Sequence, residues 1–311
     1  MDSLRVAAGV VLPMMLLMAV GFGSRVSGIA TREAMRQFDQ LLFRLFLPML
    51  LFRSIYTAST GIPDAKAVAF CYITLSVIFL VSMRYIPRYV PDGGKAASLI
   101  QSLGRANFTL YALAIVGWIY GDEGKAVAAM ICSVVVPFTS AWSVVVLETN
   151  RSGSANVGKI VISVLKNPMI VSSALGYIFR FGHIPIPGPV WGVVTDIAGV
   201  ATTVSFISLG AGLDLMEMHS NRKLIRLGTM LRMVVIPLIC IPLAAVLGFR
   251  GPVLCVLMVL YVSPAAINSY PMAVAMGADG PLAGQLVCVT TVVSLATVFV
   301  STFILHGLAL I

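Results

Sequence analysis

The segment PMMLLMAVGFGSRVSGI, residues 13–29, decides how this chain is organised, because it returns 155 positions later as PMIVSSALGYIFRFGHI, residues 168–184. Six of the 17 positions are identical: Pro13/Pro168, Met14/Met169, Ala19/Ala174, Gly21/Gly176, Arg25/Arg180 and Ile29/Ile184. Membrane carriers are often built from two related halves, with the substrate site where the halves meet. The repeat therefore predicts two related five-helix halves, residues 1–153 and 154–311.

The composition is that of an integral membrane protein. Of the 311 residues, 59% are hydrophobic and only 11% are charged, and the mean hydropathy is +0.99. A soluble domain carries roughly 25% charged residues. The net charge of +9 does not indicate nucleic-acid binding, because the basic residues form short clusters between apolar runs.

The sequence predicts no metal site, cofactor or disulfide framework. The cysteines lie inside apolar runs without a CxxC spacing, and the histidines are scattered: Cys71, Cys132, Cys240, Cys255, Cys288, His183, His219 and His306. The first residues have almost no basic segment and no small-residue cleavage site follows, so we expect a retained first span.

Ten apolar runs are long enough to cross a hydrocarbon core of about 30 Å. They are residues 4–23, 40–58, 67–85, 97–119, 126–147, 158–180, 190–214, 225–248, 252–276 and 283–308. The second run is the least regular, because Arg44, Pro48 and Arg53 interrupt it. The expected fold is an all-α membrane protein of ten helices.

Basic residues alternate between the connecting segments. The richer segments carry Arg25, Arg32, Arg36, Arg84, Arg88, Lys95, Arg151, Lys159, Arg222, Lys223 and Arg226, and the others only Lys66, Lys125, Arg180 and Arg250. The positive-inside rule then places both termini on the extracytoplasmic side. With an odd number of spans in each half, the second half enters the membrane from the opposite side, which makes the repeat an inverted one.

The candidate substrate site lies in the fourth and ninth spans, where Asn107 and Asn268 correspond at an offset of 161. A buried amide is costly unless it finds partners. Pro264 and Pro271 predict a break in the ninth helix, since proline removes a backbone donor. The fourth span has no proline. The candidate substrate-binding residues are Asn107, Thr109, Tyr111, Asn268, Ser269 and Tyr270.

Structural roles compete with these assignments. Polar side chains in membrane helices often join helices, for about 0.6 kcal/mol each. Arg44, Arg53 and Arg232 can snorkel to the interface, cap carbonyls or bind an anion. The glycine-rich stretches 21–23 and 210–212 indicate close helix packing, because they lack the setting of a nucleotide loop.

Four stretches carry a family resemblance: Leu47-Pro48-Met49-Leu50-Leu51-Phe52, Asn167-Pro168 followed by Gly176, Leu209-Gly210-Ala211-Gly212-Leu213, and Pro264-Ala265-Ala266-Ile267-Asn268-Ser269-Tyr270. In this order they resemble the auxin efflux carrier family of membrane transporters, in particular its bacterial members. The resemblance implies a 5+5 inverted repeat, crossing broken helices 4 and 9, a bacterial inner-membrane location, and asparagines at positions 107 and 268 that hold a substrate carboxylate. The family usually has Gly and Pro after the first of these asparagines. This chain has Ala112 and Ala114, which predicts a milder break.

The sequence favours a secondary transporter of small organic anions, with the lipid bilayer and the anion as its partners and a homodimer left open. The alternative is a sodium-coupled organic-anion symporter of the bile-acid type, which also has a 5+5 crossover. No deep carboxylate is expected in the ten spans, and this favours transport without sodium. An intramembrane enzyme is the third hypothesis, but no paired carboxylates or Ser/His arrangement at membrane depth point to one.

Overall fold

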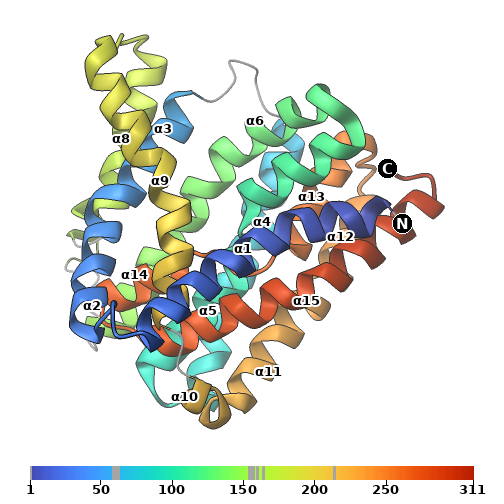
Figure 1. Cartoon of the computed structure of the whole chain (residues 1–311). Helices are drawn as coiled ribbons and strands as arrows, with labels where there is room; N and C mark the ends of the chain where they lie inside the picture. The colour runs from blue at the N-terminus through green and yellow to red at the C-terminus, as the bar shows by residue number, and fades with distance from the viewer. Residues whose placement is uncertain (1, 58–63, 153–157, 159–160, 163–164, 213–214) are drawn as a thin grey trace.

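The computed structural model describes residues 2–57, 64–152, 158, 161–162, 165–212 and 215–311 (Figure 1). Within these ranges the protein is all-helical, with one isolated β-bridge and no strand. The predicted boundary after residue 153 lies outside the described residues. Figure 1 places the two chain ends at the same end of the molecule.

The helices, in chain order, are as follows. They are α1 (Asp2–Val26), α2 (Arg32–Leu41), the π-helical η1 (Leu42–Phe46), α3 (Leu47–Tyr56), α4 (Ala65–Tyr89), α5 (Gly93–Gly104), α6 (Phe108–Ser152), α8 (Pro168–Phe181), α9 (Gly188–Gly212), α10 (Leu215–Ser220), α11 (Arg222–Met230), the π-helical η2 (Leu231–Val235), α12 (Ile236–Val246), α13 (Gly251–Val262), α14 (Ser269–Ala275) and α15 (Gly280–Gly307).

Several helices are long and apolar enough to span a bilayer. The described part of the chain contains five such segments, Ala65–Tyr89, Phe108–Thr149, Gly188–Gly212, Arg222–Val246 and Gly280–Gly307. Their outward faces are apolar: Ile73, Val246 and Phe303 are 65%, 83% and 71% exposed. Such side chains are stable on a surface that faces lipid. The protein is therefore a multi-pass integral membrane protein.

Prolines explain the two π-helical segments. Pro48 and Pro237 each stand at the start of the helix that follows η1 or η2. A proline cannot donate to the carbonyl four residues earlier, so the backbone locally shifts to bonds that reach five residues back. The Leu47 N–H accordingly donates to the Leu42 carbonyl. The chain thus stays helical through the irregular second run, from α2 to α3.

The helix α6 contains the second part of the predicted run 97–119 and the whole of the run 126–147. Gly121 has φ 61° and ψ −144°, which is not helical and separates the two parts. Beside this kink Lys125 Nζ lies 2.9 Å from Asp122 Oδ1, and both side chains are exposed. The hydrogen bond from Lys125 lowers the pKa of Asp122. An exposed ion pair at the kink is consistent with a turn in water between two membrane segments.

The helices pack in two groups. In one, α1 packs on α9, α9 on α3 and α3 on α8, and the other is formed around α4, α5, α6, α13 and α15 (Figure 1). The helix α1 also contacts α15, which joins the groups. The helices α1 and α9 meet at small residues. A Cβ atom on Gly21 would overlap the Ile207 carbonyl, and one on Gly210 would overlap the Met18 carbonyl. Close helix packing, predicted for the two glycine-rich stretches, is confirmed at these two glycines.

Two helices are interrupted where they approach each other. The helix α5 ends at Gly104 and α6 begins at Phe108, while α13 ends at Val262 and α14 begins at Ser269. An antiparallel bridge joins Ala106 to Ala265 between the two interruptions. Asn107 N donates to the Pro264 carbonyl at 2.8 Å, and Ala266 N donates to the Arg105 carbonyl at 3.0 Å. These bonds satisfy backbone groups that the broken helices leave without intrahelical partners.

Proline places the second interruption. Pro264 follows the last residue of α13 and its capping Ser263, and Pro271 lies in the first turn of α14. A proline is tolerated in a first turn, because its missing N–H has no intrahelical partner there. Pro271 therefore sets the start of α14 instead of kinking a helix interior. The break without proline, at 105–107, is shorter than the break at 263–268.

Candidate functional site

A cavity of about 180 Å³ lies at the paired interruptions. Its polar lining residues are Ser54, Arg105, Asn107, Thr109, Thr139, Ser140, Thr202 and Asn268. Leucines of α3, together with Phe108, Val136, Met169 and Ile267, supply apolar walls. Both helix groups contribute to the lining, since Leu47, Met169 and Thr202 belong to α3, α8 and α9 and Thr139 and Ser140 belong to α6.

The structure brings the predicted asparagine pair to this one cavity. Asn107 is 7% exposed, and its Nδ2 has no hydrogen-bond partner among the described residues. The Oδ1 atom of Asn268 is likewise buried without a partner there. Leaving a buried polar atom unpaired costs roughly 1–3 kcal/mol. Such atoms are expected where a ligand or water completes the bonding.

The start of α6 faces the same cavity, through Phe108, Thr109 and Leu110. The first N–H groups of a helix lack intrahelical partners and carry a partial positive charge. Thr109 was predicted to belong to the site, and it does line the cavity. The beginning of this long helix suits a negatively charged ligand.

Three other predicted residues do not line the cavity. The Tyr111 hydroxyl is 2.9 Å from Ser294 Oγ, in the contact with α15. Ser269 is buried at the start of α14, and Tyr270 points toward α2 and α9. The sequence prediction grouped them with Asn107 and Asn268 by position. Side chains of adjacent helical residues point in different directions, and this is why only part of each stretch reaches the cavity.

Tyr270 instead contacts a carboxylate that was not expected at depth. The Tyr270 hydroxyl hydrogen-bonds to Asp39, and Ser208 Oγ also donates to it. Asp39 is 1% exposed and belongs to α2, which starts at Arg32. The prediction about carboxylates concerned the ten apolar runs, and Asp39 lies outside them, one position before the second run begins at residue 40.

Arg105 lines the cavity but was not among the substrate-binding residues predicted from sequence. It is 3% exposed, yet its side chain lines the cavity. Its Nη2 lies 3.4 Å from Ser140 Oγ, and its Nη1 contacts the Met272 sulfur. No carboxylate contacts it in the part of the chain that the structure describes. The available signal was an arginine inside an apolar run, directly before the matched asparagine.

Arg232 has a structural position near the same breaks. Its Nε donates to the Ser263 carbonyl at 3.1 Å, its Nη1 to Leu103 at 2.9 Å and its Nη2 to Leu260 at 3.0 Å. These carbonyls belong to the ends of α5 and α13. Of the roles considered for Arg232, the structure supports the capping of carbonyls.

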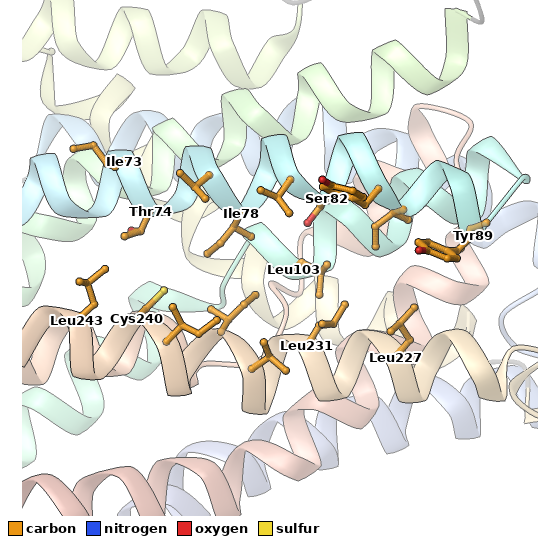
Figure 2. Close-up of a pocket in the computed structure, with 18 residues that line it drawn as sticks. Ile73, Thr74, Ile78, Ser82, Tyr89, Leu103, Leu227, Leu231, Cys240 and Leu243 are labelled. Atoms are coloured by element: carbon orange, nitrogen blue, oxygen red, sulfur yellow. The ribbon is translucent and has the colours of Figure 1, made fainter.

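A larger cavity, of about 570 Å³, lies between α4 and the helices α11 to α12 (Figure 2). Figure 2 shows apolar side chains such as Ile78, Leu231 and Leu243 directed into it from both sides. Several of its lining residues are also outward-facing, so it is a groove at the apolar surface. Its described lining residues include no charged side chain, which suits lipid chains better than an anion.

Interrupted helices, a cavity between two helix groups and an apolar outer surface define the class of an integral membrane transporter. The sequence matches the family described as membrane transport proteins over residues 6–159 and 154–302. The chain therefore belongs to this family, the auxin efflux carrier family. It is also 24% identical over 292 residues to an uncharacterized transporter from Methanothermobacter thermautotrophicus, covering 92% of this chain and 94% of the relative. These matches indicate a transporter and not an enzyme.

Proposed function

We propose that this protein is a secondary transporter of small organic anions, mono- or dicarboxylates, that works by alternating access around the crossover cavity. The observation that carries the proposal is the meeting of two interrupted helices at a cavity lined by Asn107 and Asn268. The free Nδ2 donor of Asn107 and the start of α6 both favour an acceptor with negative charge. The cavity is smaller than the roughly 300–1,000 Å³ of drug-sized sites, which favours a small substrate.

The architecture that fits this function is a 5+5 inverted repeat of ten spans, with halves 1–153 and 154–311. Each predicted apolar run overlaps a helix or a pair of helical pieces in the described residues, which supports the count. The two family matches overlap only at 154–159, close to the proposed boundary. The proposed location is a bacterial cytoplasmic membrane, with both termini outside.

The two helix groups supply a means of alternating access. The cavity is lined on one side by α3, α8 and α9 and on the other by the interruptions and α6. A displacement of one group against the other would expose the cavity first to one side of the membrane and then to the other. The backbone bonds between residues 105–107 and 264–266 would hold the binding residues together during this motion.

A thermal-shift screen of the purified protein tests the proposal. We expect acetate, butyrate, benzoate or succinate to raise the unfolding temperature, while acetamide, butyramide and benzamide do not. A ligand at 100 times its Kd stabilises by about 2.7 kcal/mol. If none of a broad set of mono- and dicarboxylates shifts the transition, the proposed substrate class is wrong.

The buried Asp39 favours a second candidate, a cation-coupled symporter of organic anions. A carboxylate that receives hydrogen bonds from Ser208 and Tyr270 can take up a proton or ligate sodium during transport. The crossover cavity itself has no carboxylate among its described lining residues. For this reason we place uncoupled transport first.

A further inference from the structure

Arg105 carries a positive charge into the interior beside the crossover cavity. The side chain is 3% exposed, and the two groups it contacts, the Met272 thioether and the Ser140 hydroxyl, are both uncharged. A buried charge is unfavourable unless it is paired and hydrogen-bonded. The guanidinium has five N–H donors, and these two contacts leave most of them without an acceptor.

The comparison with Arg232 shows what a structural arginine looks like in this protein. Arg232 is fully buried, and Nε, Nη1 and Nη2 all donate to backbone carbonyls at helix ends. Arg105 has no carbonyl partner among the described residues, and it lines a cavity, which Arg232 does not. The two arginines lie near the same helix breaks. Capping therefore accounts for Arg232 and does not account for Arg105.

One free hydrogen-bond donor shares the cavity with Arg105, because Asn107 Nδ2 has no partner among the described residues. The hydroxyl groups of Thr139 and Ser140 line the same space, but both already donate to the Val136 carbonyl and are not available as donors to a ligand. An arginine fork beside a free amide donor matches the two oxygens of a carboxylate.

The lining from α3, α8 and α9 is largely apolar, through Leu50, Leu51 and Met169, and its polar groups are the uncharged hydroxyls of Ser54 and Thr202. Only one cationic side chain lines the cavity in the described residues. One cation neutralises one carboxylate, and a second carboxylate would meet apolar side chains and uncharged hydroxyls without a cationic partner. The site is therefore suited to a small anion with a single carboxylate and an apolar body.

We propose that Arg105 is the counter-charge that binds the carboxylate of the transported anion, and that it selects small monocarboxylates over dicarboxylates. This inference rests on the proposed function. In it, the asparagines position the anion and Arg105 provides its charge partner. Without a bound anion, the buried charge of Arg105 lowers the stability of the protein. Binding of the anion removes this cost.

The test compares purified wild-type protein with Arg105→Met and Arg105→Lys, using butyrate, benzoate and succinate as probes and butyramide as the neutral control. Binding is followed by thermal shift and by calorimetry. We expect Arg105→Met to weaken butyrate and benzoate binding by roughly 10- to 150-fold, and Arg105→Lys to weaken it less. We expect wild-type protein to bind succinate more weakly than butyrate. Arg250→Met, which removes an exposed arginine outside the cavity, is the matched charge control and should bind as wild type does.

The unfolding temperature without any probe separates the proposal from a purely structural role. Arg105→Met should be at least as stable as wild type, because it removes an uncompensated buried charge. A marked loss of stability with unchanged butyrate and benzoate affinity would overturn the inference. If Arg105→Met cannot be purified, the affinity of Arg105→Lys for butyrate and benzoate is the test. Lysine lacks the two-pronged guanidinium, so an unchanged affinity would also overturn the inference. Failure of every carboxylate to bind wild type would instead refute the proposed function.

Discussion

At the scale of single residues, the polar side chains at the crossover are of two kinds: some line the cavity, and others hydrogen-bond to neighbouring helices. Asn107 and Asn268 were predictable, because an amide at matching positions of two apolar runs is unusual and costly. Tyr111 and Tyr270 were grouped with them from sequence, but their hydroxyls bond to Ser294 and Asp39. The direction of a side chain depends on the residue at which the helix begins again after the break. A run of polar residues in the sequence does not identify that residue.

Arg232 yields a prediction for stability. Replacing it with Met removes charged donors from the carbonyls of Leu103, Leu260 and Ser263, all buried at helix ends. Losing hydrogen bonds of this kind should cost about 3 kcal/mol or more, seen as a lower unfolding temperature without substrate. Arg250→Met is the control, because Arg250 also donates to carbonyls, those of Ala245 and Phe249, but is exposed. Equal small effects of both substitutions would contradict the capping role.

At the scale of helices, the sequence predicted which segments are helical better than where they break. Hydrophobic runs mark helices of membrane length, and Pro264 and Pro271 bracket the break between α13 and α14. The break at 105–107 has no proline and was expected to be mild. The chain at this break pairs with 264–266, and the Phe79 ring packs so closely on the neighbouring Gly104 that a Cβ there would overlap it. Both are tertiary contacts, which a single apolar run does not reveal.

Asp39 lies where α2, α9 and α14 meet, and it permits a test of coupling. We expect transport of a carboxylate identified by the screen to change little when sodium is replaced by choline, because the described cavity lining has no carboxylate. Asp39→Asn keeps the size of the side chain and removes its charge. The variant should keep the same insensitivity to sodium. A saturable sodium dependence in wild type that disappears in Asp39→Asn would establish the cation-coupled alternative.

At the scale of the whole molecule, the class of protein follows from composition alone. With so few charged residues, the apolar surface is stable in a lipid bilayer and not in water. The assignment of helices to two packed groups does not follow from it. That arrangement depends on contacts far apart in sequence, such as Gly21 against Ile207 and Gly210 against Met18. The inverted arrangement of the halves rests on the alternating basic loops and on the number of spans.

The orientation of the chain has a direct test. We expect both termini on the extracytoplasmic side, because the basic clusters follow the odd-numbered spans. Cysteines introduced after Ile311 and before residue 1, in a background without the native cysteines, should react with a membrane-impermeant maleimide added to intact cells. A cysteine introduced near Arg222 should react only after the membrane is permeabilised. Labelling of only one terminus in intact cells would rule out an even number of spans.

The central claim is that a substrate carboxylate binds between the two broken helices, and the binding affinities of Asn107→Ala and Asn268→Ala test it most directly. In folded, purified protein each substitution should weaken binding of the carboxylate found in the screen. The expected factor is about 10- to 150-fold, from hydrogen bonds to a charged group of roughly 1.5–3 kcal/mol. The Asp variants should bind still more weakly, because a carboxylate repels the anion. Wild-type affinity in both alanine variants would mean that the pair only joins helices, and the account of the site would be wrong.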